Sequence, residues 1–132
     1  MGGCESYGSG GHAPYKSWGE EQIARLLDRE GIAYQYEYPL AVVDRGKVRI
    51  HYPDFRLPEH GIIIEYFGVN GEKQYDEKTR HKIELYRQDG IEGIFLTRDS
   101  LRGDWPGHII SQIEGILKGR LERFYGRLRN GK

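Results

Sequence analysis

Two of the acidic residues in the segment HYPDFRLPEHGIIIEYFG, which covers residues 51–68, stand where carboxylates are unexpected. Asp54 directly follows a proline, and Glu65 ends an unbroken run of three isoleucines. A carboxylate at the end of such an apolar run is expected to be buried, and burying an unpaired charge costs several kcal/mol or more. A carboxylate that is kept in such a place needs a compensating partner.

The two acids become neighbours if the segment folds into a symmetric β-hairpin with its turn at residues 59–60. Paired residue numbers then have a constant sum, so that Asp54 faces Glu65 with Cβ atoms roughly 4.5–5.5 Å apart. Like charges in opposed positions destabilise a sheet. The repulsion is relieved if one acid keeps a proton or if a cation lies between them. Pro53 favours a break in the strand beside the pair, because it has no N–H group.

Two convergent carboxylates are hard oxygen ligands of the kind that bind Mg²⁺. This ion polarises phosphoryl oxygens and activates water for hydrolysis. Spacing alone also allows a second interpretation. In that interpretation Glu65 forms an ion pair with Arg56 or with a lysine of a helix, and Asp54 only marks the end of a strand.

The flanking sequence predicts the elements that must hold this pair. SWGE is typical of a capping box, with Ser17 as N-cap and Glu20 three residues later, and it predicts a helix that ends at Gly31. The element order is helix, three strands, helix, strand, helix, which indicates an α/β fold with a mixed central sheet of about four strands flanked by helices. Strands are predicted at residues 32–43, 47–57, 61–67 and 91–97, and the later helices at 75–88 and 105–128.

Length and composition limit the classes of protein. A chain of 132 residues is long enough for one domain. Residues 1–14 are rich in Gly and Ser and are expected to be flexible, which leaves residues 15–132 as the domain. No apolar run approaches the length of a membrane span and no apolar signal region begins the chain, so we expect a cytoplasmic protein without a membrane partner. The single Cys4 excludes an internal disulfide and a thiolate-rich zinc site.

The charge is balanced overall but uneven along the chain. The formal net charge is zero, yet the segment from Lys118 to Lys132 carries six basic residues and one acid, Glu122. A basic tail of this kind suits a polyanion such as DNA. The end of a solvated helix is an equally good interpretation.

The motif YPDFRL followed by IIIEYFG resembles the active-site hairpin of the PD-(D/E)XK nuclease superfamily. SWGE resembles the first-helix glutamate of that group, and the predicted element order is similar to its restriction-endonuclease-like core. The resemblance covers about residues 17–117. It implies a DNA endonuclease that hydrolyses phosphodiester bonds with a metal-activated water. Asp54, Glu65 and the backbone carbonyl of Tyr66 would hold Mg²⁺ or Mn²⁺, and Glu20 would reach the ion directly or through water.

The chain departs from this superfamily at one position. A lysine should stand two residues after Glu65, where this chain has Phe67. Some members of the superfamily supply the lysine from the following helix instead. The helix predicted at residues 75–88 offers Lys82 and Lys78.

Lys82 is the first candidate, because it lies beside Ile83 and Tyr86, which are predicted to face the core. It shares one side of the helix with Tyr75, Lys78 and Tyr86. Lys78 lies one turn earlier and is the second candidate. The lysine would orient the attacking water or stabilise charge on the phosphoryl oxygens.

The sequence is also compatible with two other functional classes. If both lysines are solvated surface residues, the protein would be a catalytically inactive module that binds nucleic acid on a nuclease-like fold. A metal-independent scaffold would leave the paired acids unexplained. For the nuclease, cutting both DNA strands requires two active sites, so we expect a homodimer.

Overall fold

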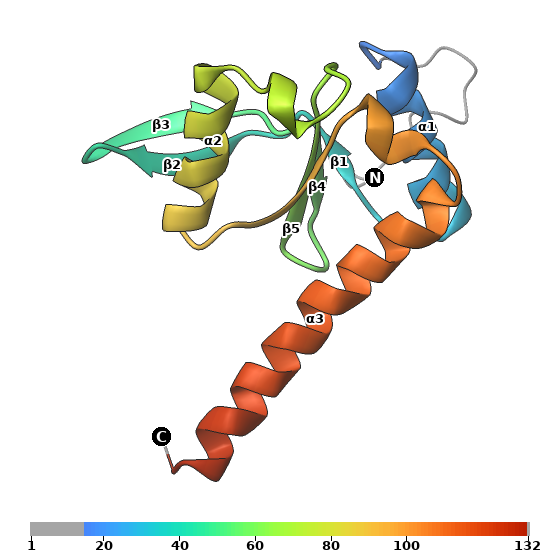
Figure 1. Ribbon diagram of the computed structural model, residues 1–132. Coiled ribbons are helices and arrows are strands. Elements are labelled where there is room, and N and C mark those ends of the chain that lie inside the picture. The colour runs from blue at the N-terminus through green and yellow to red at the C-terminus, as the bar shows by residue number, and fades with distance from the viewer. Residues whose placement is uncertain (1–14, 132) are drawn as a thin grey trace.

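The computed structural model describes residues 15–131, and Figure 1 shows their arrangement. The predicted α/β class is confirmed, because this part of the chain forms three α-helices, a mixed four-stranded sheet and a separate two-stranded sheet. Residues 1–14, which were expected to be flexible, lie outside the described residues. The elements are α1 (Trp18–Arg29), β1 (Gln35–Tyr36), β2 (Leu40–Asp44), β3 (Lys47–His51), β4 (Phe55–Leu57), β5 (Ile62–Tyr66), α2 (Glu77–Gln88), β6 (Glu92–Leu96) and α3 (Trp105–Arg129).

The four-stranded sheet runs in the order β1-β4-β5-β6. β1 is antiparallel to β4, and β4 forms an antiparallel hairpin with β5. β5 is parallel to β6, and α2 makes the crossover between them, because parallel neighbours cannot be joined by a tight turn. The prediction of a mixed sheet of about four strands is therefore confirmed.

The two long strands predicted at residues 32–43 and 47–57 are wrong in one respect, because each is broken in two. Gln35 pairs with Arg56 and Leu40 with His51, so both halves keep one register. They form a single antiparallel ribbon that is interrupted at residues 37–39 and 52–54. Each interrupting segment contains a proline, which cannot donate a hydrogen bond to the ladder.

The sheet separates two apolar clusters. Alternate residues of β5 point to opposite faces, so Ile62 and Ile64 lie in one cluster and Ile63 in the other. The first cluster contains residues of α1 and α3 and has Phe55 at its centre. The second contains Val42 of β2 and residues of α2. The helices thus cover both faces of the sheet, as predicted. The end of β5 that carries Glu65 lies between these two helical layers.

The helix ends correct three details of the predictions. Ser17 accepts a hydrogen bond from the Glu20 N–H at 3.1 Å, which confirms the N-cap, but the Glu20 side chain accepts from the N–H of Lys16 instead of Ser17. Asp76 caps α2, so Tyr75 lies before the helix and not on its side. Ile83 is only half-buried, whereas Leu85 and Tyr86 are the buried residues of α2.

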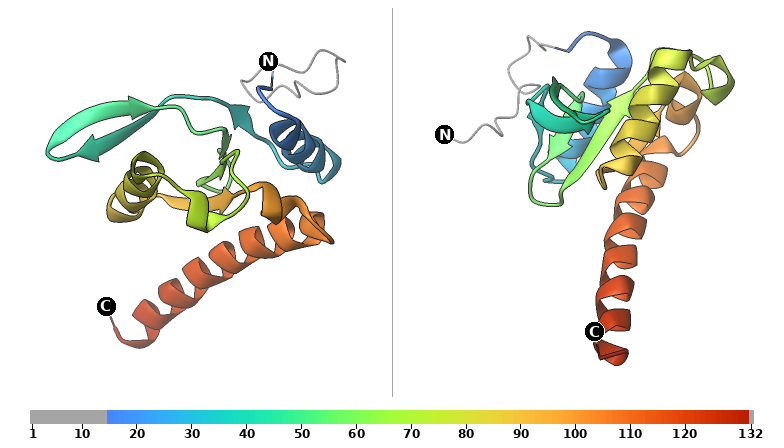
Figure 2. Two further views of the ribbon diagram at one scale, coloured as in Figure 1. Left: turned by 45° about the horizontal axis from the view of Figure 1, so that its top comes forward. Right: turned by 90° about the vertical axis from the view of Figure 1, so that its left-hand side faces the viewer.

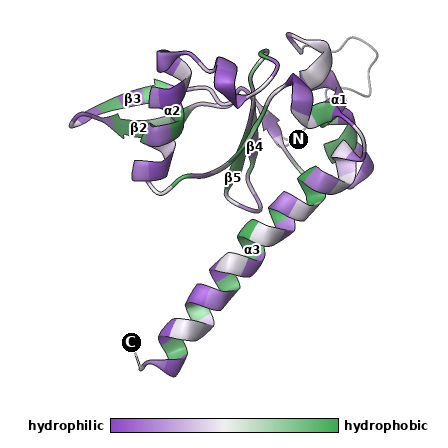
Figure 3. Ribbon diagram, in the orientation of Figure 1, coloured by the Kyte–Doolittle hydropathy of each residue, from purple (hydrophilic) through white to green (hydrophobic). Residues whose placement is uncertain are grey.

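The C-terminal half of α3 extends beyond the sheet in every view (Figures 1 and 2). Apolar residues continue along this half of the helix (Figure 3), and four of them are about half exposed: Leu121, Phe124, Tyr125 and Leu128. None of the helices within residues 15–131 combines the length and the hydropathy that crossing a bilayer requires.

Candidate active site

The predicted pairing of the two acids rests on a register that the structure confirms. Leu57 pairs with Ile62 and Phe55 with Ile64, so the same register places Asp54 opposite Glu65. The Asp54 N–H donates to Glu65 Oε1 at 3.2 Å. The next N–H of β5, that of Tyr66, donates to Asp54 Oδ2 at 2.8 Å. Each carboxylate is therefore held by an N–H group of the opposite strand.

Both acids are buried, which makes their mutual repulsion strong. Asp54 is 7% exposed and Glu65 is 2% exposed. Burial, and after it the negative charge of Glu65, raise the pKa of Asp54 to about 8, although the Tyr66 N–H bond opposes the shift. Folding thus brings together two carboxylates that cannot both ionise cheaply without a further cation.

Lys82 supplies one positive charge to this pair. Its Nζ lies 3.4 Å from Glu65 Oε2, and its side chain keeps one third of its surface exposed. The structure therefore places the first of the two candidate lysines at the carboxylates. Lys78, the second, makes no ion pair within the described part of the chain and lines a neighbouring groove.

Tyr86 orients Glu65, and the sequence predicted it only as a core residue. Its hydroxyl donates to Glu65 Oε2 at 3.1 Å, and it also lies 3.4 Å from His51 Nδ1. Burial and the charge of Glu65 raise the pKa of Tyr86, so the phenol keeps its proton and remains a donor. The spacing of four residues from Lys82 was the available signal, because it puts both side chains on one side of a helix.

Glu20 lies beside the pair without bonding to it. It is 5% exposed, and its carboxylate accepts hydrogen bonds from the Tyr36 hydroxyl and from the N–H of Lys16 at 3.0 Å. Its negative charge contributes to the raised pKa of Asp54, after burial and Glu65. Burial and the bond to Glu20 raise the pKa of Tyr36, so this phenol also stays a donor.

Gly19 allows α1 to approach the end of β5. A Cβ atom at this position would lie 2.3 Å from Cζ of Tyr66, and real Cβ atoms do not come so close to other atoms. A side chain here would require either the Tyr66 ring to move or α1 to shift together with the adjacent Glu20. The role of Gly19 could not be predicted from the sequence, because only the packed structure shows which ring it meets.

Phe67 occupies the position at which the resembled superfamily carries its lysine. Its ring packs edge-on against Tyr75, with centroids 5.2 Å apart, and stacks on Phe95 at 6.3 Å. Phe95 stacks in turn on Tyr86. The position thus belongs to an aromatic row on the α2 side of the sheet, and the cation that contacts Glu65 is Lys82 of α2.

The carboxylates of Asp54 and Glu65 fit a hard divalent cation, but fewer side chains converge on the site than the resemblance implied. Within residues 15–131, no three side chains of His, Cys, Asp or Glu lie close enough together to hold a metal by themselves. Glu20 is therefore not gathered into one shell with Asp54 and Glu65. Mg²⁺ is commonly bound through one or two carboxylates and keeps several waters, so the two acids match the number of carboxylates that it uses.

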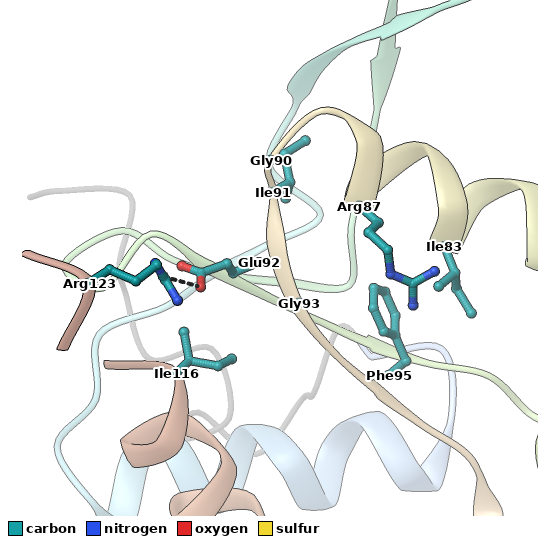
Figure 4. Close-up of a pocket in the computed structure, with 9 residues that line it drawn as sticks. All are labelled: Ile83, Arg87, Gly90, Ile91, Glu92, Gly93, Phe95, Ile116 and Arg123. Carbon is teal, nitrogen blue, oxygen red and sulfur yellow. Dashed lines mark hydrogen bonds and ion pairs between the residues drawn. The ribbon is translucent and has the colours of Figure 1, made fainter. Parts of the chain in front are cut away.

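A further cavity of the described residues lies elsewhere, between α2, β6 and α3 (Figure 4). Its volume is about 600 Å³, and Glu92 is the acid on its wall. Arg120 and Arg123 both bind this carboxylate, the second at 3.4 Å. The charge there is already compensated, and we assign no chemistry to this cavity.

Scans against protein-family models, curated proteins and solved structures found no significant match to this chain.

Proposed function

We propose that this protein is a metal-dependent DNA endonuclease of the PD-(D/E)XK type with a restriction-endonuclease-like core. One observation carries the proposal: two buried carboxylates face each other across the β4–β5 hairpin, and a lysine from α2 contacts one of them. Without a bound cation, the repulsion between Asp54 and Glu65 is relieved only by keeping a proton on Asp54, whose pKa is raised. A divalent ion removes that repulsion.

In this proposal Asp54, Glu65 and the backbone carbonyl of Tyr66 hold Mg²⁺ or Mn²⁺, and Glu20 contributes through water. When bound, the ion would polarise a phosphoryl oxygen and lower the pKa of a water molecule. The protein fixes the ligands in advance, because N–H groups of Asp54 and Tyr66 and the Tyr86 hydroxyl orient the two carboxylates. Preorganisation of this kind reduces the reorganisation that the reaction would otherwise require.

Lys82 is the proposed catalytic cation. Its partly exposed ammonium group has three N–H donors and lies beside the carboxylate that would face the substrate phosphate. It can donate to a phosphoryl oxygen while negative charge develops there, or hold the attacking water in line. Lys78, one helical turn away, would contact the neighbouring stretch of the DNA backbone.

A second candidate function is a catalytically inactive module that binds nucleic acid. The observation that favours it is Phe67, which replaces the strand lysine and packs in an aromatic row. The buried Asp54–Glu65 pair is the argument against it, since a decayed site has no reason to keep two repelling acids.

The experiment is cleavage of supercoiled plasmid DNA with Mg²⁺, with Mn²⁺ and with a chelator. We expect nicking or cutting only with the divalent ions, and loss of activity in Asp54→Asn and Glu65→Gln. Glu92→Gln is the matched control, because Glu92 is a glutamate on the neighbouring strand whose charge is already balanced by arginines. Metal-dependent DNA binding by the native protein without cleavage would favour the inactive module.

Two properties accompany the enzyme proposal. A nuclease that cuts both strands needs two active sites, so we propose a homodimer as its working form. A cytoplasmic location follows from the substrate and belongs to the same proposal. Sedimentation of the protein with and without DNA measures the first, and cell fractionation measures the second.

A further inference from the structure

A groove of about 400 Å³ opens beside the carboxylate pair, between β3 and α2. Lys82 belongs to both places, since it lines the groove and also contacts Glu65 at 3.4 Å. His51, which also lines the groove, lies 3.4 Å from the Tyr86 hydroxyl that orients Glu65. The groove and the carboxylate site therefore adjoin, and a ligand in the groove would lie next to the reacting bond.

One wall of the groove is suited to the flat, apolar face of a nucleobase. It includes Ile50 and Tyr52, which are 52% and 59% exposed. Exposed tyrosines offer a large ring that is not consumed by core packing. Tyr52 also lies just before Pro53 and Asp54, so the chain fixes its distance from the carboxylate pair.

The other wall is cationic. Lys78, His81 and Lys82 line it from α2. Asp44 is the acid of the groove, but it is paired with His81 at 3.3 Å and also lies 3.7 Å from Arg49. The pKa of Asp44 is lowered, first by its hydrogen bond to His81, which agrees with a compensated carboxylate. Lys82 already contacts Glu65, so Lys78, which makes no ion pair within the described residues, is the lysine left to attract an anion such as a phosphate.

We infer that this groove binds an unpaired nucleotide next to the scissile phosphate, with its base stacked on Tyr52 and its phosphate on Lys78. The inference rests on the proposed function and specifies the substrate class, which is DNA that is single-stranded at the cutting site. Base–aromatic stacking and a cationic track are the two features that single-strand-binding grooves combine.

Fully paired DNA does not suit this groove. A duplex presents phosphates and groove edges on its surface, while the faces of its bases are covered by stacking. A base reaches a lateral groove only if it is unpaired or flipped out, and flipping a paired base costs its pairing and stacking free energy. An apolar wall beside the carboxylates would be of little use to an enzyme that reads only the backbone of a duplex.

The test measures binding in a chelator, so that no cleavage occurs. Three fluorescent oligonucleotides of one sequence are compared by anisotropy: a single strand, a perfect duplex, and a duplex with one short unpaired loop. We expect the single strand and the looped duplex to bind more tightly than the perfect duplex. Equal or tighter binding of the perfect duplex would overturn the inference.

Variants assign the preference to the groove. Tyr52→Ala should weaken single-strand binding by about 5- to 150-fold, the range that loss of one base–aromatic stack accounts for. Tyr52→Phe keeps the ring and should retain the preference. Tyr125→Ala is the matched control, because this tyrosine is 53% exposed on α3 and lies outside the groove. It should leave the ratio of single-strand to duplex affinity unchanged.

The two proposals fail in distinguishable ways. A preference for unpaired DNA that Tyr52→Ala abolishes supports the groove, even if no metal ion produces cleavage and the enzyme proposal fails. A ratio of affinities that is the same for the native protein, Tyr52→Ala and Tyr125→Ala refutes the groove, even if the protein cuts duplex plasmid DNA.

Discussion

Two glutamates on neighbouring parallel strands, Glu65 on β5 and Glu92 on β6, are surrounded by opposite arrangements of charge. Glu92 is one third exposed and lies against two arginines of α3. Glu65 has a 3% exposed side chain and lies against one lysine and a second carboxylate, that of Asp54. In the β5–β6 ladder Glu65 pairs with Phe95 and Glu92 pairs with Ile62, so the two glutamates lie near opposite ends of the ladder.

The difference separates a structural acid from a candidate functional one. At Glu92 two cations face one acid, and the guanidinium of Arg120 also binds the carbonyls of His60 and Gly61. That cluster fastens α3 to the sheet. At Glu65 two buried acids share one cation, so ionising both would leave part of the negative charge without a partner, and Asp54 keeps a proton instead. Unbalanced charge of this kind costs stability and is typical of sites that bind ions or substrates.

The largest expected effect is on the cleavage rate, when Lys82, the cation beside the Asp54–Glu65 pair, is removed. We expect Lys82→Ala to reduce the cleavage rate by about 100- to 1,000-fold, the range found when one donor to a developing oxyanion is removed. Binding of the metal ion and of DNA should survive, because the lost interaction is made chiefly in the transition state. Single-turnover cleavage and anisotropy measure the two effects. Lys78→Ala should cost less, and native rates in both variants would refute the assignment of the cation.

The second way to test the contrast is to remove the negative charges. Asp54→Asn with Glu65→Gln should leave the metal-free fold as stable as the native one or slightly more stable. Ion binding stabilises a protein by about 2.7 kcal/mol at a hundredfold excess over the dissociation constant, and the double variant should lose this gain. Thermal melting with and without Mg²⁺ measures it. Glu92→Gln should keep the full gain, and an equal gain in all three proteins would place the ion elsewhere.

The sequence predicted this site in outline because local rules determine most of it. The hairpin register follows from the turn, and Pro53 fixes the break beside Asp54. The position of Lys82 follows from helical spacing. Contacts between distant segments could not be predicted in the same way. Neither the Tyr36 hydroxyl on Glu20 nor the room that Gly19 leaves for a ring is encoded in any short motif.

The same limit explains the errors in the fold. Residues 32–43 and 47–57 alternate like two long strands, and although Pro53 indicated an interruption beside Asp54, the local pattern did not show that both strands divide in two. Both breaks contain a proline, but the backbone of Glu37 also adopts a positive φ of 53° and its N–H donates to the Asp54 carbonyl at 3.1 Å. That contact joins the two breaks across the ribbon. It depends on the tertiary structure.

The third prediction concerns Glu92, whose charge is balanced by two arginines. Arg120→Ala removes a guanidinium that binds Glu92 and two backbone carbonyls, and hydrogen bonds to charged groups are each worth about 1.5–3 kcal/mol. Because Arg120 is one third exposed, we expect a total loss of about 2 kcal/mol. Urea unfolding measures it. The metal-dependent gain in stability should be unchanged, and a loss of that gain would mean that the two acids are not independent.

The fourth prediction uses the pH dependence of stability to distinguish the buried Asp54 from the ion-paired Glu92. The pKa of Asp54 is about 8 in the folded protein, above its ordinary value of 3.8, so the folded chain keeps a proton that the unfolded chain releases. Its contribution to stability is complete below pH 4 and is lost as the pH rises towards 8, by up to about 1.4 kcal/mol per unit. Unfolding in a chelator should show this slope in Glu92→Gln but not in Asp54→Asn. A slope that persists without the Asp54 carboxylate would assign it to another group.

The smallest effect is expected at the basic end of α3, for which the sequence left two interpretations open. Arg120 and Arg123 are engaged with Glu92, whereas Arg127 and Arg129 beyond them make no ion pair within the described residues. Replacing both Arg127 and Arg129 by Ala should weaken DNA binding and reduce its dependence on salt by about 0.7–0.9 logarithmic units for each lost phosphate contact. The slope is measured from DNA affinities at salt concentrations between about 50 and 200 mM. Arg29→Ala, an exposed arginine on α1, is the control. A slope that is equal in all three proteins would mean that the end of α3 is only a solvated helix.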